Sequence, residues 1–275
     1  MADCNACSAK DSCGKDDKAS CQVVGTNSMN TIHHIIGVMS GKGGVGKSTI
    51  AANLALTLHE QGYKVGILDA DITGPSIPRI LGIEDQRALN FPEGLRAVEM
   101  DNGLKVMSLN LLIEEEKTPV IWRGPIITNT VKQFYQDVIW GELDYLVIDM
   151  PPGTGDVTLT VMQSMPIDGM VMVSIPQDMV SMIVSKAINM TKQLGVNVFG
   201  VVENMSYMTC PCCDEKIKVF NSETVDEFLE DQEVNLLAEL PIRADMTHIG
   251  SIESEVKAIF KELSDKILAQ IPVKA

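Results

Sequence analysis

The chain has 275 residues, of which 45% are hydrophobic, 21% are charged and only 4% are aromatic. These are the proportions of a globular protein packed on aliphatic side chains and its 16 methionines, so they exclude a chain that is disordered throughout. The formal net charge of -15 repels nucleic acid and anionic lipid, and the apolar runs are shorter than the ~18 residues of a transmembrane helix. We therefore expect no nucleic-acid partner and no membrane partner.

The first 30 residues form a polar tail with no apolar periodicity. Its four cysteines are Cys4, Cys7, Cys13 and Cys21. Because the tail lacks the apolar stretch of a secretory signal, we expect the protein to be cytoplasmic. In that reducing compartment, thiols favour metal or redox chemistry over disulfides, and four thiolates are enough for a zinc site or a cluster. We therefore predict a flexible or metal-binding tail at residues 1–30 and one domain at residues 31–275.

From residue 32 onward, short apolar runs alternate with helical patterns. The predicted strands are residues 35–39, 64–68, 104–109, 145–148, 170–175, 199–203 and 236–240. The predicted helices are residues 47–61, 126–138, 180–194, 224–230 and 252–271, and the stretch 82–103 is expected to run over the surface. Such alternation is typical of βαβ units. It predicts an α/β fold with a mostly parallel sheet of about seven or eight strands flanked by helices.

A phosphate-binding loop is predicted between the first strand and the first helix. It reads Gly41-Lys42-Gly43-Gly44-Val45-Gly46-Lys47-Ser48 and fits the pattern G-x-x-x-x-G-K-[ST]. The glycines let backbone N–H groups turn towards phosphate oxygens at the positive end of the helix. Lys47 would neutralise phosphate charge, the Ser48 hydroxyl would bind Mg²⁺, and Thr49 would donate to the α-phosphate. The loop therefore predicts a nucleoside triphosphate site.

Polar side chains follow several predicted strands. Asp69 and Asp71 come after the second strand, where carboxylates can orient water or Mg²⁺ beside phosphates, although a turn or capping role is the alternative. Asp149 ends the strand at 145–148, a Walker B arrangement that holds Mg²⁺ through water. Residues 151–156 carry two prolines and two glycines, which suits a loop that senses the γ-phosphate. Asn204 suits either an adenine edge or a structural cap.

The downstream cysteines form the segment Cys210-Pro211-Cys212-Cys213. The two-residue spacer between Cys210 and Cys213 lets both thiolates converge on one metal or cluster. Because a tetrahedral metal or a [4Fe-4S] cluster needs four thiolates, we expect a second subunit to supply the other two. Cys212 is interpreted as a spacer; a ligand role for Cys212 and a redox-active pair are the alternatives.

Together these motifs resemble the Mrp/ApbC family of P-loop ATPases that carry iron-sulfur clusters, within the MinD/ParA-like class with a deviant Walker A loop. The resemblance spans about residues 32–220 and includes the segments 122–125, 140–145, 149–156, 176–177 and 203–206. It implies that Lys42 reaches the nucleotide of a partner subunit, that Asp71 positions the attacking water and that Asn204 contacts adenine. Lys42, Lys47, Asp71 and Asp149 would then be the catalytic set.

The same resemblance implies a labile [4Fe-4S] cluster that bridges a homodimer on Cys210 and Cys213 and passes to apo iron-sulfur proteins. The tail cysteines look like the N-terminal cluster motif of the scaffold branch of this family. ATP, Mg²⁺ and the cluster are therefore the expected ligands.

Two other functions fit parts of the sequence. A MinD/ParA-like spatial-organising ATPase with structural zinc is suggested by the apolar stripe within residues 252–271, but residues 222–275 hold 12 acidic and 5 basic residues, and a membrane-binding helix favours Lys and Arg. A reductase similar to the nitrogenase iron protein would use well-separated single cysteines, which a C-x-x-C pair does not resemble.

Overall fold

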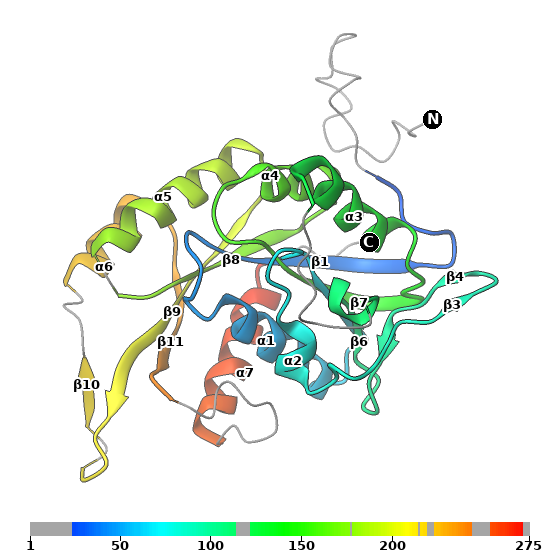
Figure 1. Cartoon of the computed structure of the whole chain (residues 1–275). Coiled ribbons are helices and arrows are strands. Elements are labelled where there is room, and N and C mark those ends of the chain that lie inside the picture. The colour runs from blue at the N-terminus through cyan, green and yellow to red at the C-terminus, as the bar shows by residue number, and fades with distance from the viewer. Residues whose placement is uncertain are drawn as a thin grey trace.

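The computed structural model describes residues 24–113, 122–176, 178–213, 215–218, 223–243 and 254–271. Cys4, Cys7, Cys13 and Cys21 lie outside these residues. The described part forms a nine-stranded sheet in the order β10-β9-β8-β1-β7-β2-β6-β5, with β11 paired to β9 (Figure 1). The pairs β5–β6 and β9–β10 are antiparallel and the other pairs are parallel. The predicted α/β fold with a mostly parallel sheet is confirmed.

The sheet strands are β1 (Thr31–Ser40), β2 (Val65–Asp69), β5 (Val98–Glu99), β6 (Lys105–Met107), β7 (Glu142–Asp149), β8 (Gly169–Ser174), β9 (Val198–Thr209), β10 (Lys216–Lys218) and β11 (Leu236–Pro241). A separate hairpin joins β3 (Asn90–Phe91) to β4 (Gly94–Leu95). The helices are α1 (Lys47–Glu60), α2 (Ile77–Leu81), α3 (Gly124–Gln136), α4 (Asp156–Ser164), α5 (Asp178–Gln193), α6 (Glu223–Asp231), α7 (Ser254–Leu268) and the 3-10 helix η3 (Leu109–Leu111).

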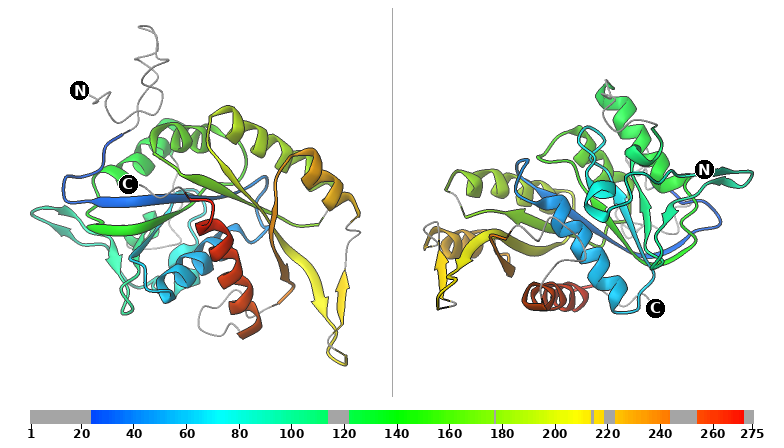
Figure 2. Two further views of the ribbon diagram at one scale, coloured as in Figure 1. Left: turned by 180° about the vertical axis from the view of Figure 1, so that it is seen from behind. Right: turned by 60° about the horizontal axis from the view of Figure 1, so that its bottom comes forward.

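The helices cover the two faces of the sheet as separate layers (Figures 1 and 2). One core cluster includes the buried side chains of α1, α2 and α7, and the other includes those of α3, α4, α5 and α6. The apolar stripe of α7 belongs to the first cluster, with Val256, Phe260, Leu263 and Ile267 all buried. The stripe therefore packs on the sheet. No helix among the described residues is long and apolar enough to cross a bilayer.

The structure differs from the predicted elements mainly at sheet edges and in short helices. It adds α2, α4, β5, β10 and the β3–β4 hairpin, each of which is short. The strand predicted at 104–109 ends at Met107, because Leu111 N donates to Ser108 O and closes a 3-10 turn. The strand predicted at 199–203 continues to Thr209. This longer β9 reaches from the centre of the fold to the cysteine segment.

The parallel strands bring their carboxyl ends to one edge of the sheet. The loop after β1 is the phosphate loop, and the carboxylates of Asp69 and Asp149 end β2 and β7. These two strands are neighbours, and their register places Asp69 opposite Asp149. Open α/β sheets bind ligands at this edge, so the fold itself gathers the predicted site.

At the opposite edge, one asparagine joins the start of β1 to the connection before β7. Asn30 Nδ2 donates to Val138 O at 2.8 Å, and its Oδ1 accepts from the backbone N–H groups of Trp140 and Gly141 at 2.8 and 3.0 Å. Trp140 is fully buried and donates its Nε1–H to Phe134 O. The side chain of Asn30 thus hydrogen-bonds three backbone groups just before the regular pairing of β1 with β7 begins.

We predict that Asn30→Ala lowers the free energy of unfolding by about 2 kcal/mol, because three backbone groups lose their partner. Urea unfolding of the nucleotide-free protein measures the change. Asn90→Ala, on the exposed strand β3, is the matched control and should leave the urea midpoint unchanged. Equal midpoints for the two variants would contradict this assignment.

Candidate functional site

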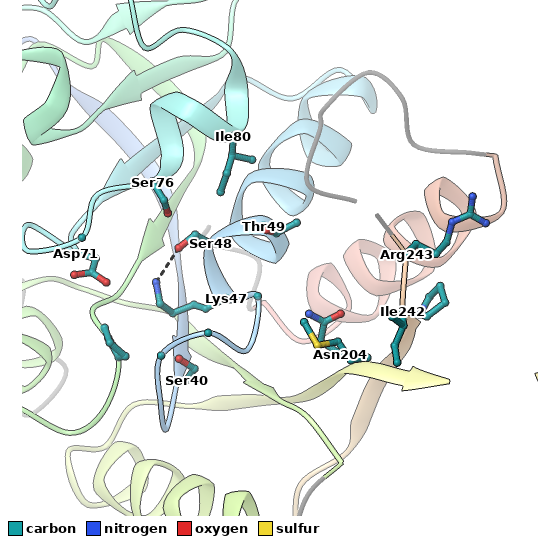
Figure 3. Close-up of a pocket in the computed structure, with 17 residues that line it drawn as sticks. Ser40, Lys47, Ser48, Thr49, Asp71, Ser76, Ile80, Asn204, Ile242 and Arg243 are labelled. Carbon is teal, nitrogen blue, oxygen red and sulfur yellow. Dashed lines mark hydrogen bonds between the residues drawn. The ribbon is translucent and has the colours of Figure 1, made fainter. Parts of the chain in front are cut away.

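A cavity of about 470 Å³ opens at the carboxyl edge of the sheet (Figure 3). The phosphate loop contributes Gly43, Gly44, Gly46, Lys47, Ser48 and Thr49 to its lining. Asp71, Gly74 and Ser76 from the loop between β2 and α2 line it as well. Asn204 and Met205 of β9 also line it, as do the residues at the end of β11. A volume in this range suits a small-molecule ligand of nucleotide size.

The phosphate loop takes a shape that only glycine accommodates without strain. Gly44 and Gly46 have φ angles of 82° and 86°, in the left-handed region. Gly46 is the N-cap of α1 and accepts a hydrogen bond from Ile50 N. The following helix therefore presents its N-terminal N–H groups to the cavity, which favours an anion there.

Asn204 holds this loop from the neighbouring strand. Its Nδ2 donates to Val45 O at 2.8 Å, and a Cβ on Gly46 would collide with the same amide. Asn204 is buried and lines the cavity. The loop engages one N–H of the amide, which leaves the second N–H and the amide oxygen for a ligand.

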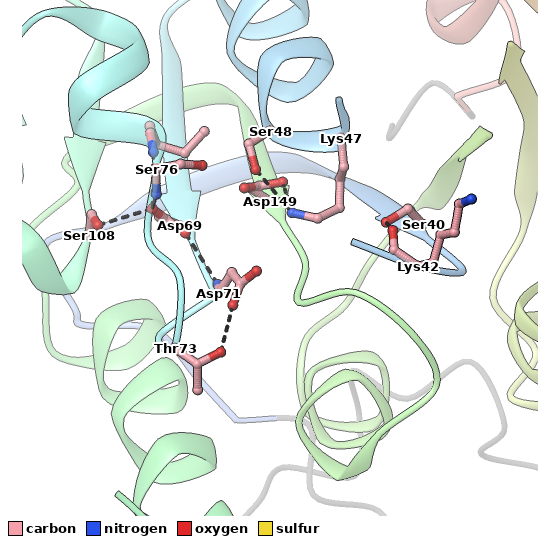
Figure 4. A network of polar contacts seen from close by, with 11 residues as sticks. Ser40, Lys42, Lys47, Ser48, Asp69, Asp71, Thr73, Ser76, Ser108 and Asp149 are labelled. Atoms are coloured by element: carbon pink, nitrogen blue, oxygen red, sulfur yellow. Dashed lines mark hydrogen bonds and ion pairs between the residues drawn. The ribbon is translucent and has the colours of Figure 1, made fainter. Parts of the chain in front are cut away.

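Lys47 and Asp149 form a buried ion pair at the centre of the site (Figure 4). Lys47 Nζ lies 2.5 Å from Asp149 Oδ1 and 3.2 Å from Ser48 Oγ. Burial raises the pKa of Asp149, and the Lys47 ammonium acts in the opposite direction. Asp149 Oδ2 is buried and has no hydrogen-bond partner among the described residues. An unpaired carboxylate oxygen beside a serine hydroxyl fits the water-mediated binding of Mg²⁺.

Asp69 and Asp71 have different surroundings. Asp69 is fully buried, and burial, together with the charge of Asp149, raises its pKa to about 8. Asp71 is partly exposed, lines the cavity and accepts a hydrogen bond from Thr73 Oγ1 at 3.0 Å. Asp71 is therefore placed to contact a ligand, whereas the buried carboxyl group of Asp69 contacts the surrounding protein.

The remaining residues predicted for the loop lie outside the cavity. Gly41, Lys42 and Val45 are absent from its lining, and the side chain of Lys42 lies away from Lys47 and Asp149 (Figure 4). The predicted γ-phosphate-sensing loop does reach the site, because Pro152 lines the cavity and Gly153 N donates to Ser40 O at 2.8 Å. Within one chain, Lys42 thus does not line the cavity.

The downstream cysteines lie at the turn of the β9–β10 hairpin. Cys210 is partly buried, and Cys212 and Cys213 are exposed. The backbone N–H of Cys212 and the thiol and backbone of Cys213 hold the pKa of the Cys210 thiol below its ordinary value. Within the described ranges, no three His, Cys, Asp or Glu side chains are grouped to hold a metal ion. The hairpin therefore offers thiols to the outside.

Several residues that line the cavity are not among the predicted site residues. Met205, Ile242 and Arg243 line the cavity because β9 and β11 are parallel neighbours. Met205 also has a positive φ of 56°, which is uncommon for a residue other than glycine. Their place in the site follows from the sheet order, which periodicity alone does not give.

Comparison with known proteins finds relatives across most of the chain. Residues 31–272 match the family described as the NUBPL iron-transfer P-loop NTPase. An iron-sulfur cluster carrier protein of Clostridium perfringens is 51% identical over 260 residues, which cover 90% of this chain and 91% of that protein. A protein of the same description from Methanocaldococcus jannaschii is 43% identical over 242 residues, covering 87% of this chain and 83% of that protein.

Solved structures agree with this relationship. The nucleotide-binding protein of Archaeoglobus fulgidus in complex with ADP is 39% identical and superimposes with a TM-score of 0.69, covering 88% of this chain and 93% of that chain. The cell division ATPase MinD of Pyrococcus furiosus is 21% identical with a TM-score of 0.59, covering 86% of this chain and 98% of that chain. The second likeness shows a shared fold.

We predict that Gly46→Ala destabilises the phosphate loop by about 1–3 kcal/mol, because the left-handed φ and the contact with Asn204 both oppose a Cβ. Thermal unfolding of the nucleotide-free protein measures this loss. Gly43→Ala is the matched control in the same loop, since a Cβ there meets no atom within 4 Å. A Gly46→Ala protein as stable as the Gly43→Ala protein would show that the loop has a different conformation.

Proposed function

The chain belongs to the NUBPL iron-transfer P-loop NTPase family, and we propose on that basis that it binds and hydrolyses ATP and carries a labile [4Fe-4S] cluster to apo iron-sulfur proteins. One observation carries the proposal. Strand β9 lines the nucleotide cavity with Asn204 and Met205 and ends beside Cys210 at the exposed hairpin. A nucleotide site and a pair of thiols thus share one structural element.

The nucleotide half of the proposal follows from the charges in the cavity. The phosphates would lie at the N-terminus of α1, with Lys47 turned to the β- and γ-phosphates. Ser48 and Asp149 would hold Mg²⁺, which neutralises phosphate charge when bound. Asp71, which faces the cavity from the β2–α2 loop, would orient the attacking water. Asn204 Oδ1 would accept from the exocyclic amino group of adenine.

The cluster half follows from the number and reactivity of the thiols. A lowered pKa favours the thiolate of Cys210, which is the form that binds iron. One hairpin offers the pair Cys210 and Cys213, and a [4Fe-4S] cargo needs four thiolates. Two copies of the hairpin would complete the set, so we infer a homodimer that shares the cluster. Lys42, which lies outside its own cavity, would reach the nucleotide of the partner.

The exposed thiols of the hairpin suit a protein that passes its cluster to other proteins rather than one that retains it. Cys212 and Cys213 are exposed, so a recipient protein can approach the cargo and exchange ligands with it. Three points stay predictions: the cytoplasmic location, the division into a tail at residues 1–30 and one domain at residues 31–275, and cluster binding by Cys4, Cys7, Cys13 and Cys21.

The first test is the metal content of the full chain after anaerobic reconstitution. We expect about four iron and four sulfide per dimer on the hairpin site, lost in Cys210→Ala/Cys213→Ala. Cys212→Ala is the matched control and should keep the cluster. Tail-bound iron is separated by repeating the comparison in a chain whose four tail cysteines are alanine. Zinc instead of iron in every form would contradict the carrier function and leave a nucleotide switch with structural zinc.

The second test concerns hydrolysis. We predict that Asp71→Asn lowers kcat for MgATP by about 100-fold or more, because the water loses its orienting carboxylate, while ADP binding stays close to wild type. Asp101→Asn, at an exposed turn before β6, is the control. Wild-type turnover in Asp71→Asn would remove Asp71 from the reaction.

A further inference from the structure

Two buried polar side chains that follow β6 contact the end of β2 and the β2–α2 loop. This loop comprises residues 70–76 and forms one wall of the nucleotide cavity through Asp71, Gly74 and Ser76. Ser108 and Asn110 are buried and lie outside the lining of the cavity. Both belong to the 3-10 turn that ends β6. We refer to Ser108 and Asn110 together as the β6 clamp.

The first contact of the clamp runs through Asp69. Ser108 Oγ donates to Asp69 Oδ2 at 3.1 Å, in the fully buried space between β2 and β6. The same carboxylate accepts from Asp71 N at 3.2 Å, from Ser76 N at 3.1 Å and from Ile77 N at 3.3 Å (Figure 4). Asp69 therefore holds both ends of the loop, and Ser108 fixes the carboxylate that does so.

The second contact bypasses Asp69. Asn110 Nδ2 donates to Pro75 O at 3.3 Å. Pro75 has no backbone N–H, so its carbonyl is the one main-chain group through which it can be held. Leu109 and Leu111 on either side of Asn110 are buried, and Leu111 O accepts from Ala88 N at 2.9 Å. The β6 clamp is thus part of a turn that packing and a backbone hydrogen bond hold in place.

The loop itself needs such support. Thr73 and Gly74 at its tip are exposed, and Ile72 is its buried apolar anchor. Asp71 comes directly before this anchor and Thr73 directly after it, and the Asp71 carboxylate accepts from Thr73 within the loop. The direction of that carboxylate therefore depends on how the two ends of the loop are held.

We propose that Ser108 and Asn110 are positioning residues for ATP hydrolysis, which fix the β2–α2 loop so that Asp71 faces the phosphate loop. The inference rests on the proposed role of Asp71 and extends it to residues after β6, three strands away from the β1 strand that leads into the phosphate loop. β6 pairs with β2 in parallel register, with Leu68 opposite Met107. The residues that come next in sequence are the contacting pair, Asp69 at the end of β2 and Ser108 just after β6. The register of β6 against β2 thus places the β6 clamp where it can hold the β2–α2 loop.

The experiment is steady-state MgATP hydrolysis by the full chain. We expect Ser108→Ala and Asn110→Ala each to lower kcat, by about tenfold for Ser108→Ala, since small displacements of a catalytic group carry large rate penalties. KM should change less than about twofold, because neither side chain lines the cavity. Ser108→Thr, which keeps the hydroxyl, should turn over faster than Ser108→Ala.

The matched control is Ser264→Ala on α7. Ser264 is as buried as Ser108, and its Oγ donates to a backbone carbonyl, Lys261 O, at 2.7 Å. It should lose stability without losing kcat. Should Ser108→Ala fail to fold, Asn110→Ala alone carries the test, because Asn110 is slightly more exposed and its contact is longer.

A double-mutant cycle distinguishes positioning from general damage. If the clamp acts through Asp71, adding Ser108→Ala to Asp71→Asn lowers kcat no further, whereas independent effects multiply. Wild-type kcat in both clamp variants, with Asp71→Asn inactive, would overturn this inference and leave the proposed function intact. Full activity in Asp71→Asn would overturn the proposed role of Asp71 as well. Multiplying effects would show that the clamp is structural only.

Discussion

The buried contact between the Lys47 ammonium and the Asp149 carboxylate is the interaction on which the rest of the site depends. Asp69 lies opposite Asp149 on the adjacent strand, so two buried carboxylates share the field of one ammonium. Removing charges from water is expensive unless each is compensated, and Asp149 Oδ2 has no hydrogen-bond partner in the described part of the chain. The site is therefore built to gain a cation, and a phosphate would offer Lys47 a second anion. Burial and the charge of Asp149 raise the pKa of Asp69, and the four hydrogen-bond donors around its carboxyl group oppose that shift because they favour the ionised form.

Strand β9 gives this charge site a connection to the thiols. Asn204 contacts the phosphate loop, and Met205 beside it has a left-handed backbone. Further along the same strand, Tyr207 O accepts from Ile242 N at 2.7 Å, beside the end of the cavity. Cys210 follows within the same hairpin. Only a few residues separate positions 204–205 from Cys210 along β9. A ligand that changes the backbone at 204–205 is coupled to the thiols if β9 has two arrangements that bind the ligand and the cluster with different affinities.

The sequence predicted the part of the fold that is encoded locally. The seven predicted strands are found because continuous apolar runs mark strands buried on both faces. It missed α2, which has five residues including Pro78, and β10, whose three residues are exposed, because neither has a detectable period. Lys47, Ser48, Asp71 and Asn204 were predicted to meet and do line one cavity. Ser108 and Asn110 were missed because their contacts depend on which strand lies next to β2.

We expect nucleotide and cluster to act on each other through β9, which the cavity and the cysteine hairpin share. The most direct measurement is the rate at which the reconstituted full chain gives up its cluster to an iron chelator, with and without Mg²⁺ and a non-hydrolysable ATP analogue. We expect the analogue to change this rate, and we expect the change to disappear in Gly46→Ala, because a Cβ there opposes the conformation of the phosphate loop. Equal release rates in the presence and absence of the analogue, with the analogue shown to be bound, would contradict coupling between the two sites.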